Sequence, residues 1–308
     1  MPPLPEPFDL PPELVDSLSA VPGRPPATPR DSASVVLVRD HPAGGVEVFL
    51  MRRAATMAFA PGMTVFPGGS VDGRDRVGGA VRAHWAGPAP EWWAERFGCA
   101  PDLAAALVSA AVRETFEETG VLLAGADDRD VVRDAGRYSS ARPLLESGAL
   151  SLGEFLAANE LVLRADLLTP WANWVTPEVE ARRHDTRFFL AELPPGQRAD
   201  GRTSEAVQAR WLTPAAALEE WRQGDRALLP PTWVTLSELA DQDSVSSARR
   251  TPRVIGRTVP RIIREGGRLR VVVPEPSEGG RAVTRRGGPP RSGTSERMGG
   301  RRDRTAWW

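Results

Sequence analysis

The sequence predicts an α/β domain, and three observations support that prediction. Short β-branched runs, such as SASVVLVR at 32–39, are typical of strands. The stretch 104–121 instead places its apolar residues at helical spacing. The chain has 308 residues and is 41% hydrophobic, which allows one large domain or two small ones with a proper core.

The two ends of the chain differ in composition from the stretch between them, which is called the body below. Residues 1–30 contain ten prolines and no apolar run long enough for a signal peptide or a membrane span. Residues 277–308 carry eight Arg against three acids and are rich in Gly and Pro, which is typical of disorder. We therefore expect a proline-rich lead-in at 1–30, a folded domain at 31–276 and a disordered tail at 277–308.

Along the body, local sequence predicts each element in turn. Strands are expected at 32–39 and 46–52, joined by the loop 41–45, and a helix at 90–97 follows. Further strands are expected at 121–123, 186–192 and 205–212, with two short strands between 253 and 274. Further helices are expected at 127–138, at 151–159 with Ser151 as cap, at 215–223 after Thr213, and at 230–240. Asp102 is expected to cap the helix 104–121.

The end of that helix, RETFEETGV, gathers three acids. At 3.6 residues per turn, Glu114, Glu117 and Glu118 share one narrow arc, and Arg113 can pair with Glu117 four residues on. Like charges at this spacing repel one another, so the arrangement favours a bound cation, and oxygen ligands favour Mg²⁺ or Mn²⁺. A solvated acidic face is the competing interpretation.

An earlier segment, TVFPGG at 64–69, favours the metal site. A short strand enters a Pro-Gly-Gly turn, where the backbone carbonyls of Gly68 or Gly69 can approach a metal or phosphate without a Cβ in the way. A strand, a glycine turn and an acid-bearing helix together indicate a metal-dependent phosphate site.

FPGG followed by RETFEETGV resembles the Nudix box, GX5EX7REUXEEXGU, where U is aliphatic. Arg113 lies 44 residues after Gly69 in place of the usual 14, so 30 residues are inserted. Counted back from Arg113, the first box acid falls on Ala105, and Thr115 takes an aliphatic position. Interrupted boxes of this kind, and the segments VFLMRRAATMAFAPGMTVFPGG and RRHDTRFFLAELP, resemble the Nudix subgroup that includes the peroxisomal coenzyme A diphosphatase.

The resemblance implies an α/β/α sandwich with a mixed sheet, with the insertion placed at 70–101. It implies a hydrolase that cleaves the diphosphate of a nucleoside diphosphate derivative, with coenzyme A or an acyl-coenzyme A favoured. The expected catalytic residues are Arg113, Glu114, Glu117, Glu118 and an acid outside the box, Glu205. The expected metal ligands are Gly68, Gly69, Glu114, Glu117 and Glu118, and the candidate phosphate-binding residues are Arg52, Arg182 and Arg183.

Other interpretations stay open at this point. The substrate can be another nucleotide, such as a dinucleotide, a nucleotide sugar or a nucleoside triphosphate, or the domain can be a binding module without catalysis. The single cysteine, Cys99, excludes an intrachain disulfide, and we expect a cytoplasmic protein with no membrane or specific nucleic-acid partner. The aromatic insertion is expected to form an outer cover or a homodimer interface.

Overall fold

The computed structural model describes residues 4, 8, 25–57, 60–76, 83–203, 206–265 and 268–273. The strands are β1 (Arg30–Asp40), β2 (Val46–Arg53), β3 (Thr64–Val65), β4 (Gly68–Ser70), β5 (Trp85–Ala86), β6 (Ala124–Gly125), β7 (Val162–Arg164), β8 (Leu168–Val175), β9 (His184–Glu192), β10 (Ala206–Leu212), β11 (Arg257–Thr258), β12 (Arg261–Glu265) and β13 (Arg268–Val272). The helices are α3 (Pro90–Phe97), α4 (Pro101–Thr119), η1 (Ala135–Ala141), α5 (Arg142–Glu146), α6 (Leu152–Ala158), η2 (Ala165–Leu167), α7 (Pro214–Arg222), α8 (Pro230–Ala240) and α9 (Val245–Arg250).

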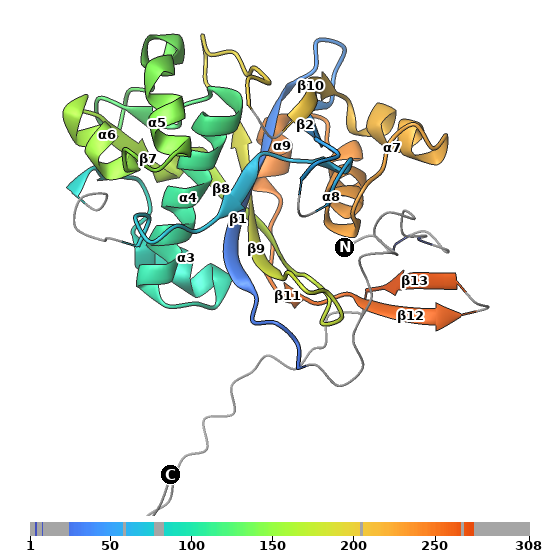
Figure 1. The fold of residues 1–308 in the computed structure, drawn as a ribbon. Coiled ribbons are helices and arrows are strands. Elements are labelled where there is room, and N and C mark those ends of the chain that lie inside the picture. Colours follow the sequence, from blue (N-terminus) through green and yellow to red (C-terminus); the bar gives the residue numbers. More distant parts are fainter. Residues whose placement is uncertain are drawn as a thin grey trace, which may run out of the picture. The chain divides into compact units, whose positions relative to one another are not determined.

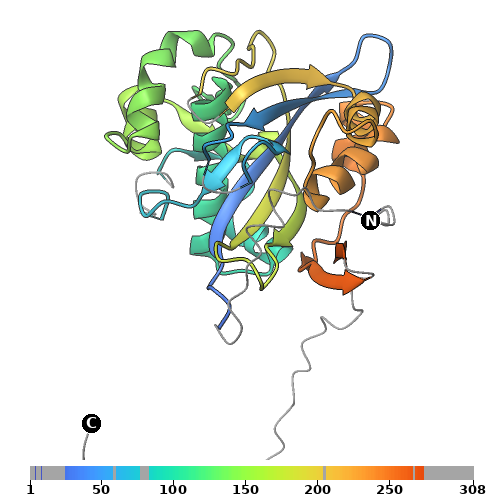
Figure 2. The ribbon, with the colours of Figure 1, turned by 45° about the vertical axis from the view of Figure 1, so that its right-hand side comes forward.

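One mixed sheet organises the domain. Its strand order is β10-β2-β1-β9-β8-β11, with β3 added to β2 and β4 to β1. The central strand β1 runs parallel to β9 and antiparallel to β2 and β4. Figure 2 shows β10 at the edge of the sheet beside β2.

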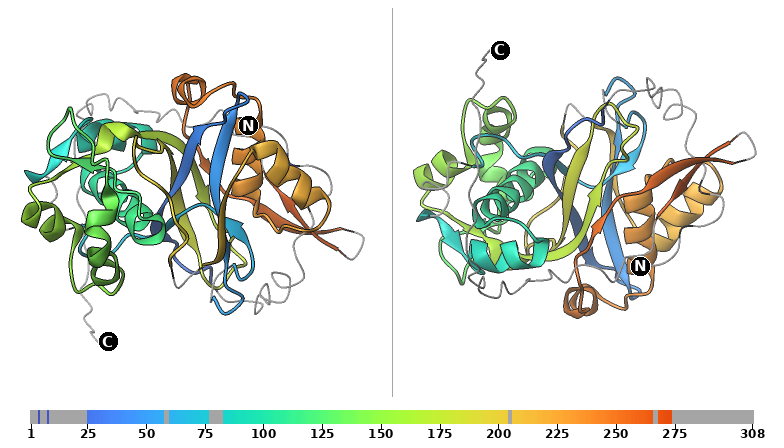
Figure 3. Two further views of the ribbon diagram at one scale, coloured as in Figure 1. Left: turned by 90° about the horizontal axis from the view of Figure 1, so that it is seen from above. Right: turned by 90° about the horizontal axis from the view of Figure 1, so that it is seen from below.

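Helices cover both faces of this sheet, as Figures 1 and 3 show: α3 to α6 lie on one side and α7 to α9 on the other. Because successive side chains of a strand point to opposite faces, Val35 and Leu37 of β1 enter the core under α3 and α4. Val36 and Val38 enter the core under α7 and α8. All four are fully buried, which explains why β1 is apolar at every position of this run. The predicted α/β/α sandwich is confirmed.

Several local predictions are also confirmed. Helix α3 has the predicted bounds. The side chain of Ser151 accepts a hydrogen bond from the backbone N–H of Glu154 at 3.2 Å, and the Glu154 carboxylate accepts one from the N–H of Ser151 at 2.9 Å. Thr213 caps α7 by accepting from the N–H of Ala216 at 3.2 Å.

The predicted strand at 121–123 is wrong, although its residues are fully buried. The amide of Gln197 takes the place of a neighbouring strand. It accepts from the N–H of Leu122 at 2.8 Å and donates to the carbonyl of Leu122 at 2.9 Å. A side chain 75 residues away therefore forms the hydrogen bonds that the Leu122 backbone would otherwise make to a strand. A local sequence pattern cannot predict that contact.

Two helix predictions also need correction. Residues 127–134 form no helix; Asp127 instead accepts hydrogen bonds from the N–H groups of Arg129 and Asp130, a local turn that competes with helix formation. Asp102 is not the cap of α4, because the helix begins at Pro101 after Ala100 and no side chain caps it.

Most of the lead-in lies outside the described residues, but Phe8 is buried and stacks on Trp221 at 5.6 Å between ring centroids. At least that residue is part of the folded body. The tail at 277–308 lies outside the described residues, and its disorder stays a prediction. Within the part of the chain that the structure covers, no helix is long and apolar enough to cross a membrane.

Candidate active site

The acidic end of α4 is buried, not solvated. Glu117 and Glu118 are 7% and 6% exposed, and Glu114 is also largely covered. Strand β4 packs on this end of the helix, and Arg113 holds two of the acids. A solvated acidic face is therefore excluded as the reason for these residues.

The Arg113 guanidinium is the centre of this cluster. It donates to the Asp75 carboxylate at 3.0 and 2.9 Å, to Glu114 at 2.9 Å and to both oxygens of Glu117 at 3.2 and 3.1 Å. A further bond reaches the carbonyl of Ser70 at 3.2 Å. Burial opposes its charge, but the hydrogen bonds to Asp75 and the surrounding carboxylates outweigh burial and raise the pKa of Arg113. The arginine thus fixes the orientation of Glu114 and Glu117.

Asp75 is the residue that the sequence analysis missed. It is 5% exposed and forms a bidentate ion pair with Arg113, which is 38 residues further along the chain. Counted forward from Gly69, Asp75 stands at the GX5E spacing of the box. The extra residues therefore lie between Asp75 and Arg113, and the assignment of the first box acid to Ala105 is wrong. Counting the box forward from Gly69, in place of backward from Arg113, would have identified Asp75 from the sequence.

Substituting Asp75 by Asn should lower turnover by about 10- to 100-fold, because Arg113 loses its ionic partner and no longer holds the helix acids firmly. Asp72→Asn is the matched control, since Asp72 lies in the same turn and pairs with Arg74. Turnover measured beside thermal unfolding checks this. Equal activity in the Asp75 and Asp72 variants would contradict a positioning role for Asp75.

The glycine turn meets the helix acids directly. The N–H of Gly68 donates to Glu118 at 2.7 Å. Gly68 has φ +153°, and a Cβ there would lie 2.3 Å from the carbonyl oxygen of Ala33. A Cβ on Gly69 would lie 2.4 Å from a carboxylate oxygen of Glu114. Only glycine fits at 68, where the clash is with backbone, whereas a side chain at 69 would displace the Glu114 carboxylate, so the turn and the acids form one unit. Coordination by the carbonyls of Gly68 and Gly69 stays a prediction.

The donor chemistry fits a hard divalent cation. Asp75, Glu114 and Glu117 surround the single charge of Arg113, and Glu118 lies beside them at the N–H of Gly68, so the buried cluster holds more negative than positive charge when ionised. Burial raises the pKa of Glu114 to about 7 and also raises that of Glu117. Within the described residues no three acidic, His or Cys side chains converge on one point, because Arg113 and the N–H of Gly68 hold the oxygens. To bind a metal ion, these carboxylate oxygens would have to give up hydrogen bonds from Arg113 or from the N–H of Gly68.

The candidate phosphate-binding arginines do not meet at this cluster. Arg52 lines a separate small cleft with Arg210 and Glu220, whereas its neighbour Arg53 lines the main pocket. The alternation of side chains along β2 sends the two arginines to opposite faces. Arg53, and not Arg52, therefore lies in the pocket beside the acids, and phosphate binding by either arginine stays a prediction.

Arg183 is a correction of another kind. Its guanidinium is buried and donates to the carbonyls of Thr176 and Ala27 at 3.0 and 2.9 Å, so it ties a loop to the chain and is not available to a phosphate. Arg182 is exposed and does not line the main pocket. Glu205 lies outside the described residues.

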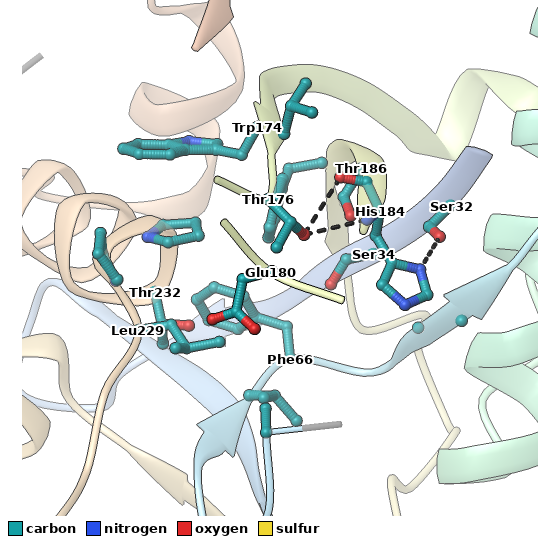
Figure 4. A pocket seen from close by; sticks show the side chains of 18 of the residues that line it. Ser32, Ser34, Phe66, Trp174, Thr176, Glu180, His184, Thr186, Leu229 and Thr232 are labelled. Atoms are coloured by element: carbon teal, nitrogen blue, oxygen red, sulfur yellow. Dashed lines mark hydrogen bonds between the residues drawn. The ribbon is translucent and has the colours of Figure 1, made fainter. Parts of the chain in front are cut away.

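A pocket of about 390 Å³ opens beside the acids (Figure 4). Gly68, Gly69 and Glu114 form one edge, and Arg53 and His184 contribute polar groups. Ser32 bonds to Nδ1 of His184 at 2.9 Å, and burial lowers the pKa of this histidine. Apolar side chains from β8, β9 and the start of α8 line much of the remainder, among them Trp174, Phe188 and Leu229. The dimensions suit a small-molecule substrate.

Several known proteins are similar to this chain in sequence. The family model of the NUDT19 Nudix domain matches residues 95–239. The acyl-coenzyme A diphosphatase NUDT19 of Xenopus laevis is 26% identical over 225 residues, covering 63% of this chain and 59% of that protein. The Homo sapiens protein of the same name is 30% identical over 259 residues, covering 68% and 64%. This chain spans about three fifths of the length of the first curated relatives.

A solved structure agrees with these relatives. The crystal structure of a NUDIX hydrolase from Alicyclobacillus acidocaldarius is similar with a TM-score of 0.61 and 27% identity. The match covers 74% of this chain and 98% of that one. The chain therefore has the Nudix fold, and its sequence resembles the Nudix subgroup that includes the acyl-coenzyme A diphosphatases.

Proposed function

We propose that this chain hydrolyses the diphosphate linkage of a nucleoside diphosphate derivative, with coenzyme A or an acyl-coenzyme A as the favoured substrate. The observation that carries the proposal is the buried cluster in which Arg113, held by Asp75, orients Glu114 and Glu117 at the edge of the pocket. The names of the relatives, acyl-coenzyme A diphosphatases, supply the favoured substrate.

Each residue then has a defined task. Glu114, Glu117 and Glu118 would hold Mg²⁺ or Mn²⁺, which when bound neutralises the diphosphate and lowers the pKa of water. Arg113 fixes the rotamers of Glu114 and Glu117, and the glycine turn keeps bulk away from Glu114. Arg53 offers a positive charge on the pocket wall.

Glu205 stays the candidate for the base. A cytoplasmic location and a homodimer also stay predictions.

A panel of diphosphate compounds tests the substrate. With Mg²⁺ present, kcat/KM should be highest for coenzyme A or an acyl-coenzyme A and lower for ADP-ribose, a dinucleotide, a nucleotide sugar and a nucleoside triphosphate. Separation of the products by mass identifies the bond that breaks. Preference for another member of the panel would keep the reaction class and replace the substrate.

The pH dependence of metal binding follows from Glu114. Its pKa in the folded, metal-free protein is about 7, above the ordinary 4.5, because burial disfavours the charged form. The folded state therefore binds more protons than the unfolded state between these values, and the metal-free protein should lose stability as pH rises from about 4.5 to 7. The gain in Tm on adding Mg²⁺ should grow over pH 6 to 8.

Thermal unfolding at pH 5, 6, 7 and 8, with Mg²⁺ and with a chelator, measures both trends. Glu114→Gln is the matched control, and it should flatten the dependence on pH. A gain in Tm from Mg²⁺ that does not change between pH 6 and 8 would contradict the assignment of Glu114 as a ligand.

A further inference from the structure

The pocket beside the acids extends well past the glycine turn. Its far walls come from the start of α8, from β8 and from residues that precede and form the β12–β13 hairpin, including Pro260, Ile262 and Val271. These walls are largely apolar. The hairpin lies outside the segment that matches the family model, so this part of the pocket is a feature of this chain's C-terminal region.

One carboxylate reaches into this apolar space. Glu180, in the loop between β8 and β9, lines the pocket, and Figure 4 shows its side chain directed into it. Burial alone raises the pKa of Glu180, with no nearby charge contributing. Among the residues that the structure describes, none donates a hydrogen bond or forms an ion pair with this carboxylate.

This arrangement calls for a partner from the ligand. Glu180 is half-buried and its carboxylate oxygens are not among the fully buried unsatisfied atoms, so water can still reach them in the free protein. A ligand that fills the apolar pocket would displace that water, and an unmet hydrogen bond would then be costly unless the ligand brings a donor. The pocket also contains the positively charged Arg53, which disfavours a cationic ligand group and leaves a neutral donor as the better partner for Glu180.

We propose that Glu180 is a specificity-determining residue that accepts a hydrogen bond from a neutral N–H or O–H donor of the substrate group lying in this pocket. The inference rests on the proposed function for the identity of that group. In coenzyme A the donor can come from two sources, the amides and hydroxyl of the pantetheine arm or the adenosine moiety.

Isothermal titration calorimetry of the two halves of coenzyme A binding to the full chain tests the role of Glu180 without requiring turnover. The probes are 4′-phosphopantetheine and adenosine 3′,5′-bisphosphate, each titrated with Mg²⁺ present. Glu180→Leu removes the acceptor and should weaken the half that occupies the pocket by about tenfold or more, leaving the other unchanged. Glu180→Gln retains an acceptor oxygen, so its affinity for the same half should fall by less than in Glu180→Leu. Glu178→Gln, an exposed neighbour in the same loop, is the control and should change neither affinity.

The outcomes separate this inference from the proposed function. The half whose affinity falls in Glu180→Leu identifies the occupant of the pocket, even if coenzyme A is not hydrolysed. Hydrolysis of coenzyme A with both affinities unchanged in Glu180→Leu would overturn the role of Glu180 alone, as would failure of both halves to bind the unmodified chain. A fall in the Tm of Glu180→Leu with unchanged affinities would show a structural role and also overturn it, because removal of a half-buried carboxylate that has no partner among the described residues should not destabilise the fold.

Discussion

Glu118→Gln should lower hydrolysis by at least ~100-fold while the fold stays intact. Glutamine keeps the size of the side chain and can still accept the hydrogen bond from the N–H of Gly68, which is 2.7 Å from the carboxylate. What it removes is a negative charge from a buried site that we assign to a divalent cation. The measurement is kcat/KM for coenzyme A at saturating Mg²⁺, with Tm recorded on the same sample.

Glu95→Gln is the matched control for this result. Glu95 lies on α3 with its side chain 83% exposed, so the same chemical change there should leave kcat/KM within about twofold. Full activity in Glu118→Gln would show that the cation is not held by this residue. A large fall in Tm would instead make the loss of activity a folding defect.

Trp93→Ala should lower the free energy of unfolding by about 3–5 kcal/mol. Trp93 is fully buried and lies 5.5 Å from Phe189 and 6.1 Å from Phe97 between ring centroids. Its removal leaves a cavity between α3 and the sheet. Since small domains have only about 5–15 kcal/mol of stability, this variant should be partly unfolded at elevated temperature. Turnover per folded molecule should be close to that of the unmodified chain.

Chemical denaturation of Trp93→Ala beside two controls measures this. Trp93→Phe should cost less, because the indole N–H has no hydrogen-bond partner among the described residues and phenylalanine keeps most of the apolar contact. Trp92→Ala should also cost less, since Trp92 is only half-buried and Arg96 covers it at 3.4 Å. Equal losses of unfolding free energy in Trp92→Ala and Trp93→Ala would contradict the difference in packing between the two side chains. A change in molecular mass in solution would show that the insertion also forms an interface.

The parts of the fold that could be predicted from the sequence are those set by local pattern. Val35 to Val38 are apolar at consecutive positions because both faces of β1 are covered, and the Pro at the start of α3 and Gly98 after it mark that helix plainly. The acids of α4 and the glycine turn were recognisable because their spacing is a property of the sequence itself. Their burial was not, because it depends on β4 and the insertion folding over them.

The contacts that were missed join residues far apart in the chain. Asp75 meets Arg113 across 38 residues, and Gln197 replaces a strand beside Leu122. Arg142 donates to the carbonyl of Glu117 at 3.0 and 3.1 Å and pairs with Asp200, which secures the end of the acidic helix. The spacing from Gly69 marks Asp75, but a lone arginine or glutamine carries no periodic signal, so only the tertiary structure reveals the partners of Arg142 and Gln197.

Hydrolysis of an acyl-coenzyme A in water enriched in ¹⁸O, with products weighed by mass spectrometry, tests whether water attacks a phosphorus of the diphosphate. Attack of water on phosphorus predicts two products, adenosine 3′,5′-bisphosphate and the acyl-phosphopantetheine, with one of them carrying a single ¹⁸O in its new phosphate. Formation of both should stop in the presence of a chelator and in Glu118→Gln. An unbroken diphosphate, or cleavage at the thioester in its place, would contradict metal-dependent hydrolysis of the diphosphate by this site.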